Sequence, residues 1–453
     1  MSTRVNIIST FIALLLGWQS SAQSALDGYI ATALHNNEGV KQQQFQLDKS
    51  LEALKEARTL FLPSVSMLGS YTRAAGGRTI DLPIGDLFNP VYGTLNQLTQ
   101  AHNFPTVQNA SILLNPDNFY DAKFRTSMPL INAEVYYNKQ IKKQAITLQQ
   151  ASVNVYKRAL VKDVKAAYFQ YFQSVQAIDI YKSALKLVEK NITVNESLLR
   201  NGVRNSTALT RSRTEQQKIQ AQLTEAENNS RNVRAYFNFL LNRPLDTDVA
   251  LDSTLAAENN IHLDMPASTG DVSKREELMQ LNTKKEMLSL NRKLEQAYIV
   301  PKLNTFIDLG EQGFNWTIND KSKYYLFGVN LEWNLFAWGQ HNYRSRQSQL
   351  DIATTASQYD ETEKAFRLQL SQAVNNYNTA VSNFYSARSQ RELAEKYYAD
   401  QLKAYKEGAL LYIELLDAQN QLTAAQLQLS LAMAGVQIAL AEAEKDMATY
   451  PIN

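Results

Sequence analysis

Two long segments of the chain, Ala133–Asn201 and Gln340–Glu407, contain no glycine and no proline, and each runs directly into a glycine. Since these are the residue types that most strongly interrupt a helix, each segment is expected to form one continuous helix. At about 1.5 Å per residue such a helix is roughly 100 Å long. Helices of globular proteins usually have about 8–20 residues, so these helices are expected to form a coiled coil, a rod or a tunnel wall.

The two segments are also copies of one another. A shift of 206 positions places Gly202 on Gly408 and Tyr171 on Tyr377 without a gap. Apolar residues recur at steps of three and four in both copies, which is the pattern of a seam that packs against a neighbouring helix. The chain is therefore interpreted as a tandem duplication of a unit of about 200 residues, which is too long for a solenoid repeat.

Composition excludes several classes of function. The 453 residues are 44% hydrophobic and 20% charged, and the net charge of +2 indicates no nucleic-acid partner. Cysteine is absent, which excludes disulfides, thiolate metal sites, cysteine nucleophiles and a lipid-modified N-terminal cysteine. The four histidines are isolated in sequence, and no catalytic motif has a plausible setting, so we expect no metal, no cofactor and no enzyme activity.

The N-terminus has the order of a secretory signal peptide. Arg4 precedes the apolar run Ile7–Leu16, and small residues follow up to Ala22. Residues 1–22 are therefore expected to be removed on export, and no lipid anchor is expected. No later apolar run is expected to reach the length of a membrane-spanning helix, so the mature chain is predicted to be secreted or to insert as a β-barrel.

Four segments between the helical blocks change from a period of about 3.6 to a period of two. In the last of them Tyr325, Phe327 and Val329 alternate with more polar residues. Amphipathic strands of about ten residues are long enough to cross a bilayer when tilted. Strands are therefore expected at about 63–73, 123–132, 302–312 and 323–336.

These elements divide the chain into two repeats. The first repeat is predicted at 23–243 with a helical hairpin at 133–242, and the second at 271–453 with a hairpin at 340–449. Residues 244–270 are expected to link them. The segment Arg73–Ala122 holds four of the ten prolines and is expected to be a long surface loop.

Four strands cannot form a closed barrel in lipid, because the two edge strands would leave backbone groups unpaired. Two chains would make an eight-stranded barrel filled by side chains, whereas three would make a twelve-stranded barrel with a lumen. We therefore expect a mainly α protein with a membrane β-barrel, in which a homotrimer spans the outer-membrane lipid and continues as an α-helical tunnel into the periplasm. A soluble periplasmic coiled-coil scaffold or adaptor is the alternative.

The duplicated order of helix, strand pair, long helix and glycine turn resembles the TolC-type outer-membrane efflux protein family over the mature chain. The segments that carry the resemblance are Tyr405 with Gly408, Ile413–Ala418, Leu335–Gly339 and Pro129–Asn132. The resemblance implies a homotrimer that docks to a periplasmic adaptor (membrane fusion) protein and an inner-membrane transporter. It implies a passive exit duct for small molecules or proteins in a tripartite efflux or type I secretion system.

The acidic pair Glu414 and Asp417 is three residues apart and hence on one face of a helix. By resemblance these residues, with Tyr405, match the positions that line the closed periplasmic aperture of the family. Charged rings in a constriction favour one sign of ion. The alternative is that two acids near a helix start only complement the helix dipole.

The two glycine turns are the predicted contact with the adaptor, through Gly202 and Val203 in the first turn and Gly408, Ala409 and Leu410 in the second. The glycines could equally be required for the turn conformation alone. The chain departs from the family pattern at Leu410, where a basic residue is usual, and at Ala208, where an acidic residue is usual. A polar lock between those two positions is therefore not expected.

Overall fold

The computed structural model describes residues 25–203, 205–252 and 271–452. The predicted signal peptide and most of the predicted linker lie outside the described residues. The chain divides into two compact units, and both are assembled from separate stretches of sequence. The helical unit comprises the described residues of 1–51, 144–288 and 350–453, and the sheet unit comprises 52–143 and 289–349.

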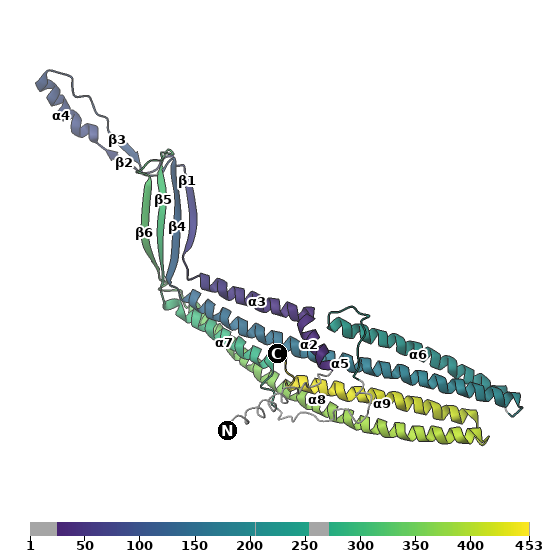
Figure 1. The fold of residues 1–453 in the computed structure, drawn as a ribbon. Helices are drawn as coiled ribbons and strands as arrows, with labels where there is room; N and C mark the ends of the chain where they lie inside the picture. The colour runs from purple at the N-terminus through teal and green to yellow at the C-terminus, as the bar shows by residue number, and fades with distance from the viewer. Residues whose placement is uncertain (1–24, 204, 253–270, 453) are drawn as a thin grey trace, which may run out of the picture. The chain divides into compact units, whose positions relative to one another are not determined.

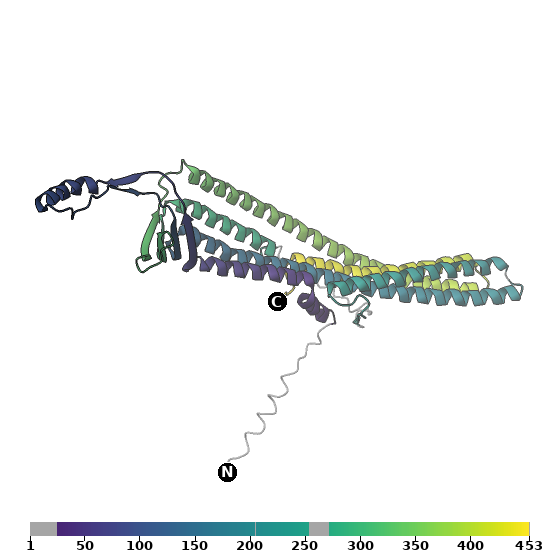
Figure 2. The same cartoon turned by 90° about the horizontal axis from the view of Figure 1, so that it is seen from above.

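Long helices dominate the chain. They are α2 (Ala25–Asn36), α3 (Glu38–Thr59), α5 (Ala133–Arg200), α6 (Ser206–Leu240), α7 (Glu276–Gln296), α8 (Gln340–Lys406) and α9 (Tyr412–Asp446). The two expected long helices are present, because α5 has 68 residues and α8 has 67 without interruption. Each is followed by a returning helix of 35 residues, α6 or α9, which lies alongside it in both views (Figures 1 and 2).

The core of the helical unit is formed by the seams of these hairpins. Val164, Ala167 and Tyr168 of α5 are completely buried, together with Phe237 of α6. Farther along, Tyr377 and Phe384 of α8 pack with the apolar face of α9. Burial of a large side chain contributes about 1.5–3 kcal/mol, so the spacing at steps of three and four is what holds the four helices together.

One helix differs from the expectation that no later run could span a membrane. By length and composition alone, α9 is apolar enough to do so, and 44% of its most apolar window is buried inside the protein. Its buried residues include Leu415, Val436 and Ala443. The apolar composition of α9 is explained by its place in the core of the helical unit, where it needs apolar residues on more than one side.

The sheet unit contains one four-stranded sheet. Its strands are β1 (Ser64–Thr72), β4 (Phe119–Ile131), β5 (Lys302–Phe314) and β6 (Lys323–Glu332), in the order β1-β4-β5-β6. All three pairings are antiparallel, and the central pair joins β4 of the first repeat to β5 of the second. Among the described strands, the outer pair β1 and β6 each have one edge without a partner.

Two strand ends lie four residues from their predicted positions. β4 begins at Phe119 because its first residues still pair with β5, where the rings of Phe119 and Phe314 lie 5.1 Å apart. β6 ends at Glu332 and not at residue 336, since its pairing stops at Lys302, the first residue of β5. Pro301 precedes Lys302 and has no N–H to continue the ladder.

The expectation of a long loop at 73–122 is wrong for most of that segment. It contains α4 (Ile84–Thr99) and a small hairpin of β2 (Thr79–Leu82) and β3 (Ala110–Leu113). The prolines suggested a loop, but Pro83 immediately precedes the helix, and Pro90 lies within it. Side chains of the helix bind the returning backbone and hold it against a helix that contains a proline.

Candidate functional site

The two hairpin turns have the same backbone geometry. Gly202 and Gly408 adopt φ of +69° and +79°, in the left-handed region. The next residue in each turn donates to a carbonyl five residues earlier, at 2.9 Å for Val203 and 3.0 Å for Ala409. This is the Schellman arrangement, in which a glycine ends a helix at low steric cost. A turn requirement therefore accounts for both glycines.

Tyr405 lies inside the helical unit near the second turn and is 2% exposed. Its hydroxyl donates to Oδ1 of Asn195 on α5, and Nδ2 of Asn195 donates to Ser212 Oγ on α6 at 2.7 Å. The ring of Tyr405 packs on Tyr412 with centroids 5.8 Å apart. The partner of Tyr405 is thus Asn195, while Ala208 packs against the same apolar cluster.

A second polar contact lies one turn of α5 away. Asn191 Nδ2 donates to Gln419 Oε1 of α9 at 2.8 Å, and both residues are buried. Sequence reasoning missed Asn191 and Asn195, although the seam spacing contains the signal. Ala184 and Val188 are buried positions of α5, and steps of three and four from them reach the two asparagines. Buried asparagines in a helical seam specify register more than they add stability.

Burial also affects the tyrosines of this cluster. It raises the pKa of Tyr398 and of Tyr412, because a buried site disfavours the charged phenolate. Within the described ranges, the one carboxylate buried near them is that of Glu215, which lies 3.2 Å from Lys218 Nζ within α6. Among the described residues of 181–223 and 394–422 that form this region, the contacts between the hairpins are thus hydrogen bonds and apolar packing.

Glu414 and Asp417 are both exposed and lie on one face of α9, whereas the residue after each of them, Leu415 and Ala418, is buried. The Glu414 carboxylate accepts a hydrogen bond of 3.1 Å from the N–H of Leu411, which caps the start of α9. Asp417 accepts one of 2.7 Å from Gln421. The capping contact is the structural role that the sequence left open for Glu414. It leaves the acidic face available to solvent.

The turn residues differ in accessibility. Gly202, Val203, Gly408 and Ala409 are exposed, with 61% of Val203 accessible. Leu410 is half-buried and packs against the cluster of Tyr405 and Leu415. Leu410 is therefore placed to support the second turn from inside. Gly202 and Val203 form the accessible surface of the first turn, and Gly408 and Ala409 form that of the second.

The sheet has two chemically different faces. One cross-strand row consists of directly paired residues, Met67, Phe124, Leu309 and Tyr325, and each is between 54% and 78% exposed. The next row on this face adds Val65, Ile307 and Phe327, which are also exposed. An apolar face of this size on a sheet indicates contact with a membrane or with another protein.

The opposite face carries charge. Arg125 of β4 lies across from Asp308 of β5 and donates two hydrogen bonds of 2.7 Å to its two carboxylate oxygens. Asp121 accepts from Lys123 at 2.6 Å and from the Tyr324 hydroxyl at 2.8 Å. Charged groups on alternate residues of a strand that is apolar on its other side are typical of a membrane strand that faces an aqueous lumen.

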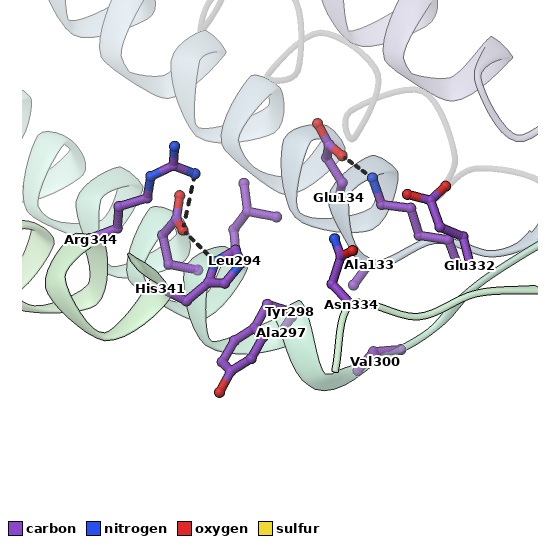
Figure 3. Close-up of a pocket in the computed structure, with 12 residues that line it drawn as sticks. Ala133, Glu134, Leu294, Ala297, Tyr298, Val300, Glu332, Asn334, His341 and Arg344 are labelled. Atoms are coloured by element: carbon purple, nitrogen blue, oxygen red, sulfur yellow. Dashed lines mark hydrogen bonds and ion pairs between the residues drawn. The ribbon is translucent and has the colours of Figure 1, made fainter. Parts of the chain in front are cut away.

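A small cavity lies where the strands meet the helices within the sheet unit (Figure 3). Its volume is about 280 Å³. The ring of His341 stacks on Tyr298 at 4.3 Å, and His341 Nδ1 lies 3.2 Å from Glu295 Oε2. Across the cavity Lys302 Nζ lies 3.0 Å from Glu134 Oε2.

These contacts join the end of α7 to the start of α8 and the start of β5 to the start of α5, so the cavity has a structural role. Sequence reasoning treated His341 as isolated, because its partners lie more than 40 positions away. Among the residues that the structure describes, no group of three or more histidine, aspartate or glutamate side chains could hold a metal ion.

Comparison with known proteins shows what the chain resembles. Residues 273–444 match the family model described as outer membrane efflux protein. A comparison with curated proteins returns no match. Among solved structures, the outer-membrane channel OprN is 15% identical with a TM-score of 0.72, covering 93% of this chain and 89% of that chain.

Two further solved structures are similar over nearly the whole chain. The open state of the Neisseria gonorrhoeae MtrE outer membrane channel is 15% identical with a TM-score of 0.73, covering 95% of this chain and 93% of that chain. The Campylobacter jejuni CmeC outer membrane channel is 14% identical with a TM-score of 0.72, covering 93% and 85%. At such identities the likeness shows the fold, and the family model matches a segment that lies within the second repeat. The chain thus has the fold of these outer-membrane channels over nearly its whole length, and its residues 273–444 resemble the outer membrane efflux protein family.

Proposed function

We propose that three copies of this chain form an outer-membrane channel that serves as the passive exit duct of a tripartite efflux or type I secretion system. The observation that carries the proposal is the sheet, which combines an exposed apolar face, a charged face and two unpaired edges among the described strands. A soluble scaffold would leave the apolar face in water. At about 25 cal/mol per Å² this exposure is costly, whereas contact with lipid removes the cost.

The strand directions are compatible with closure by copies of the same chain. β1 runs antiparallel to β4, β4 to β5, and β5 to β6, so β1 of a neighbouring copy would run antiparallel to β6. Every strand in such a ring has two partners, which removes the unpaired edges that lipid does not tolerate. Three copies make twelve strands, enough for a lumen lined by the charged face.

For the periplasmic end, we propose that Glu414 and Asp417 of the three copies line the aperture. Both carboxylates are exposed on one face of α9, and no lysine or arginine is paired with either among the described residues. Tyr405 would act indirectly in this arrangement, since its bond to Asn195 holds α8 to α5 beside the acidic face. Rings of carboxylates at a constriction favour cations.

For the partners, the proposal places a periplasmic adaptor at the two turns and an inner-membrane transporter beyond it. The exposed turn residues Gly202, Val203, Gly408 and Ala409 offer the contact, and Leu410 supports the second turn. Leu411 and Ile413, which are 59% and 46% exposed, extend the apolar surface beside that turn. Exposed apolar residues at the end of a helical hairpin are typical of a protein interface.

The experiment is single-channel recording of the detergent-purified protein in a planar bilayer. The native chain should give cation-selective openings, and Glu414→Gln/Asp417→Asn should reduce the selectivity because six carboxylates leave the trimer. The matched control is Asp400→Asn/Glu407→Gln, which removes the same charge from exposed positions of α8 and the turn that follows it. Absence of channels together with a monomeric protein would overturn the duct. Equal selectivity in all three proteins would remove the acidic pair from the aperture while the duct stands.

A further inference from the structure

The insertion between β1 and β4, residues 73–118, is a built structure and not a loop. Asn89 of α4 donates to the Val107 carbonyl at 2.9 Å and accepts from the Val107 N–H at 2.8 Å. Asn96 forms the same pair of bonds with the backbone of Phe104, at 2.8 and 3.1 Å. Two asparagines thus hold the returning chain along one face of the helix (Figure 1).

The start of α4 is held on the same face. Asn109 accepts hydrogen bonds from the N–H groups of Gly85 and Asp86, at 2.9 and 3.2 Å. A Cβ added at Gly85 would lie 2.4 Å from the Val107 carbonyl oxygen, so the returning backbone lies directly on the helix at this point. Gly85, Asn89 and Asn96 are spaced by four and seven residues, which places them on one stripe of the helix.

The opposite stripe of α4 is exposed and apolar. At 100° per residue, Leu87 is rotated by about 200° from Gly85. Leu87, Val91 and Leu98 are 67%, 53% and 76% exposed. With Thr94 they follow steps of four, three and four, which is the spacing of a seam between packed helices. The Thr94 hydroxyl already donates to the Pro90 carbonyl at 2.9 Å, so it can enter an apolar contact.

The apolar stripe of α4 could contact either lipid or another helix, and the charge of α4 favours another helix. Asp86 is the only charged residue of α4, and the helix contains no lysine or arginine. Helices that lie on a lipid surface usually carry basic residues beside their apolar face. A neutral seam with heptad-like spacing is instead suited to another helix of the same kind.

Chain topology supplies that partner. The insertion leaves from β1, which is an edge strand, and it joins the strands at the ends that do not lead into helices. In a closed ring of three copies, each insertion would therefore lie at the outer rim beside the junction with the next copy. Rotational symmetry brings the same surface of each copy to an equivalent place around one axis.

We propose that the α4 helices of three copies pack on one another through the seam Leu87, Val91, Thr94 and Leu98, and that they form a cap at the outer mouth of the duct. The proposed cap depends on the proposed function, because it requires the trimeric duct. The asparagine contacts hold each helix rigid, so that the seam is presented without further ordering of the insertion.

The absence of cysteine allows a direct test by cross-linking in isolated outer membranes. Val91→Cys places a thiol on the seam. Gly93→Cys is the matched control, because position 93 is exposed on the same helix away from the seam and an added Cβ there meets no atom within 4 Å. A short bis-maleimide should join Val91→Cys into a dimer-sized band at several-fold higher yield than Gly93→Cys. Native mass measurement reports the trimer independently.

The outcomes separate the cap from the duct. A trimer with equal or no cross-linking at both positions overturns the cap and leaves the duct in place. A fluorophore can also be attached to the thiol of Val91→Cys. If brominated lipid quenches this fluorophore and no cross-link forms, the seam contacts lipid and the cap is overturned. Absence of a trimer overturns both proposals. In planar bilayers Val91→Glu should conduct more than the native chain and more than Gly93→Glu, because three carboxylates cannot pack in one seam.

Discussion

The two helical hairpins have the same dimensions but different places in the helical unit. α5 and α8 differ by one residue in length, α6 and α9 are equal, and both turns use a glycine in the same conformation. Burial differs between equivalent helices. α5 contains more buried residues than its counterpart α8, and α9 contains more than its counterpart α6. The duplicated helices therefore share lengths and turns, whereas their neighbours determine which of them becomes the core.

Side chains at equivalent positions show the same divergence. Asn195 is buried and bound to Tyr405, while the residue that corresponds to it in the second repeat, Gln401, is half-buried. Asn191 is buried, whereas its counterpart Tyr397 is 37% exposed. The two copies of the hairpin have different neighbours. Polar residues of one copy can therefore form contacts that the other copy lacks.

The largest expected difference between the hairpins concerns an equivalent leucine pair. Leu415 is completely buried near the second turn, and its counterpart Leu209 is half-buried. Leu415→Ala should lower the free energy of unfolding by about 3 kcal/mol because it leaves a cavity, and Leu209→Ala by less than half of that. Guanidinium unfolding in detergent, followed by circular dichroism, measures both. Equal losses would contradict the unequal burial of the hairpins.

The next effect concerns the contact between the hairpins. Tyr405→Phe leaves the buried Oδ1 of Asn195 without its donor and should cost about 1–3 kcal/mol. Adding Asn195→Leu removes the unsatisfied group, so the double variant should be more stable than the sum of the two single losses predicts. The same unfolding assay on all four proteins provides the comparison. Strict additivity would show that the two side chains are not coupled.

A smaller and symmetrical effect is expected at the turns. Gly202→Ala and Gly408→Ala each force a side chain into the left-handed region, at a cost of about 1 kcal/mol. An added Cβ meets no atom within 4 Å at either position, so backbone strain is the only penalty. The two losses should agree in unfolding experiments. If one glycine were much more sensitive, the two turns would not be equivalent.

The smallest effect on stability is expected only at alkaline pH, and it concerns Tyr450, which follows the second hairpin. Burial, followed by the Asp27 charge, raises the pKa of Tyr450 to about 12. An unfolded tyrosine has a pKa of about 10, so the contribution is complete below pH 10 and is lost as pH rises towards 12. Tyr450→Phe should therefore lose less of its melting temperature than the native protein between these values. Parallel melting curves at pH 10 and above would contradict this.

Much of the fold could be predicted from the sequence, because its signals are local. Long runs without glycine or proline correspond to α5 and α8, and alternation of apolar residues in 325–331 corresponds to β6. α4 could not be recognised in the same way. Its prolines indicate a loop, and the bonds of Asn89 and Asn96 that hold it involve backbone up to 18 residues away.

The candidate site was predictable only in part. The resemblance suggested Glu414, Asp417 and Tyr405 as aperture residues, which stays a prediction; in the structure the two acids are exposed and the tyrosine is buried. The partner of Tyr405 is 210 residues away in sequence, so no spacing rule connects it to Asn195. The stacking of His341 on Tyr298 was missed for the same reason.

The sequence by itself determined the duplicated plan, the helix lengths, the glycine turns and the alternating strands, since each depends on backbone conformation or on a residue period of a few positions. Only the tertiary structure decided that β4 and β5 join the two repeats in one sheet, that α9 becomes a core helix and that Asn195 binds Tyr405. Those choices depend on contacts between residues far apart in the chain. Their partners are selected by packing and by satisfaction of buried polar groups, which no local pattern records.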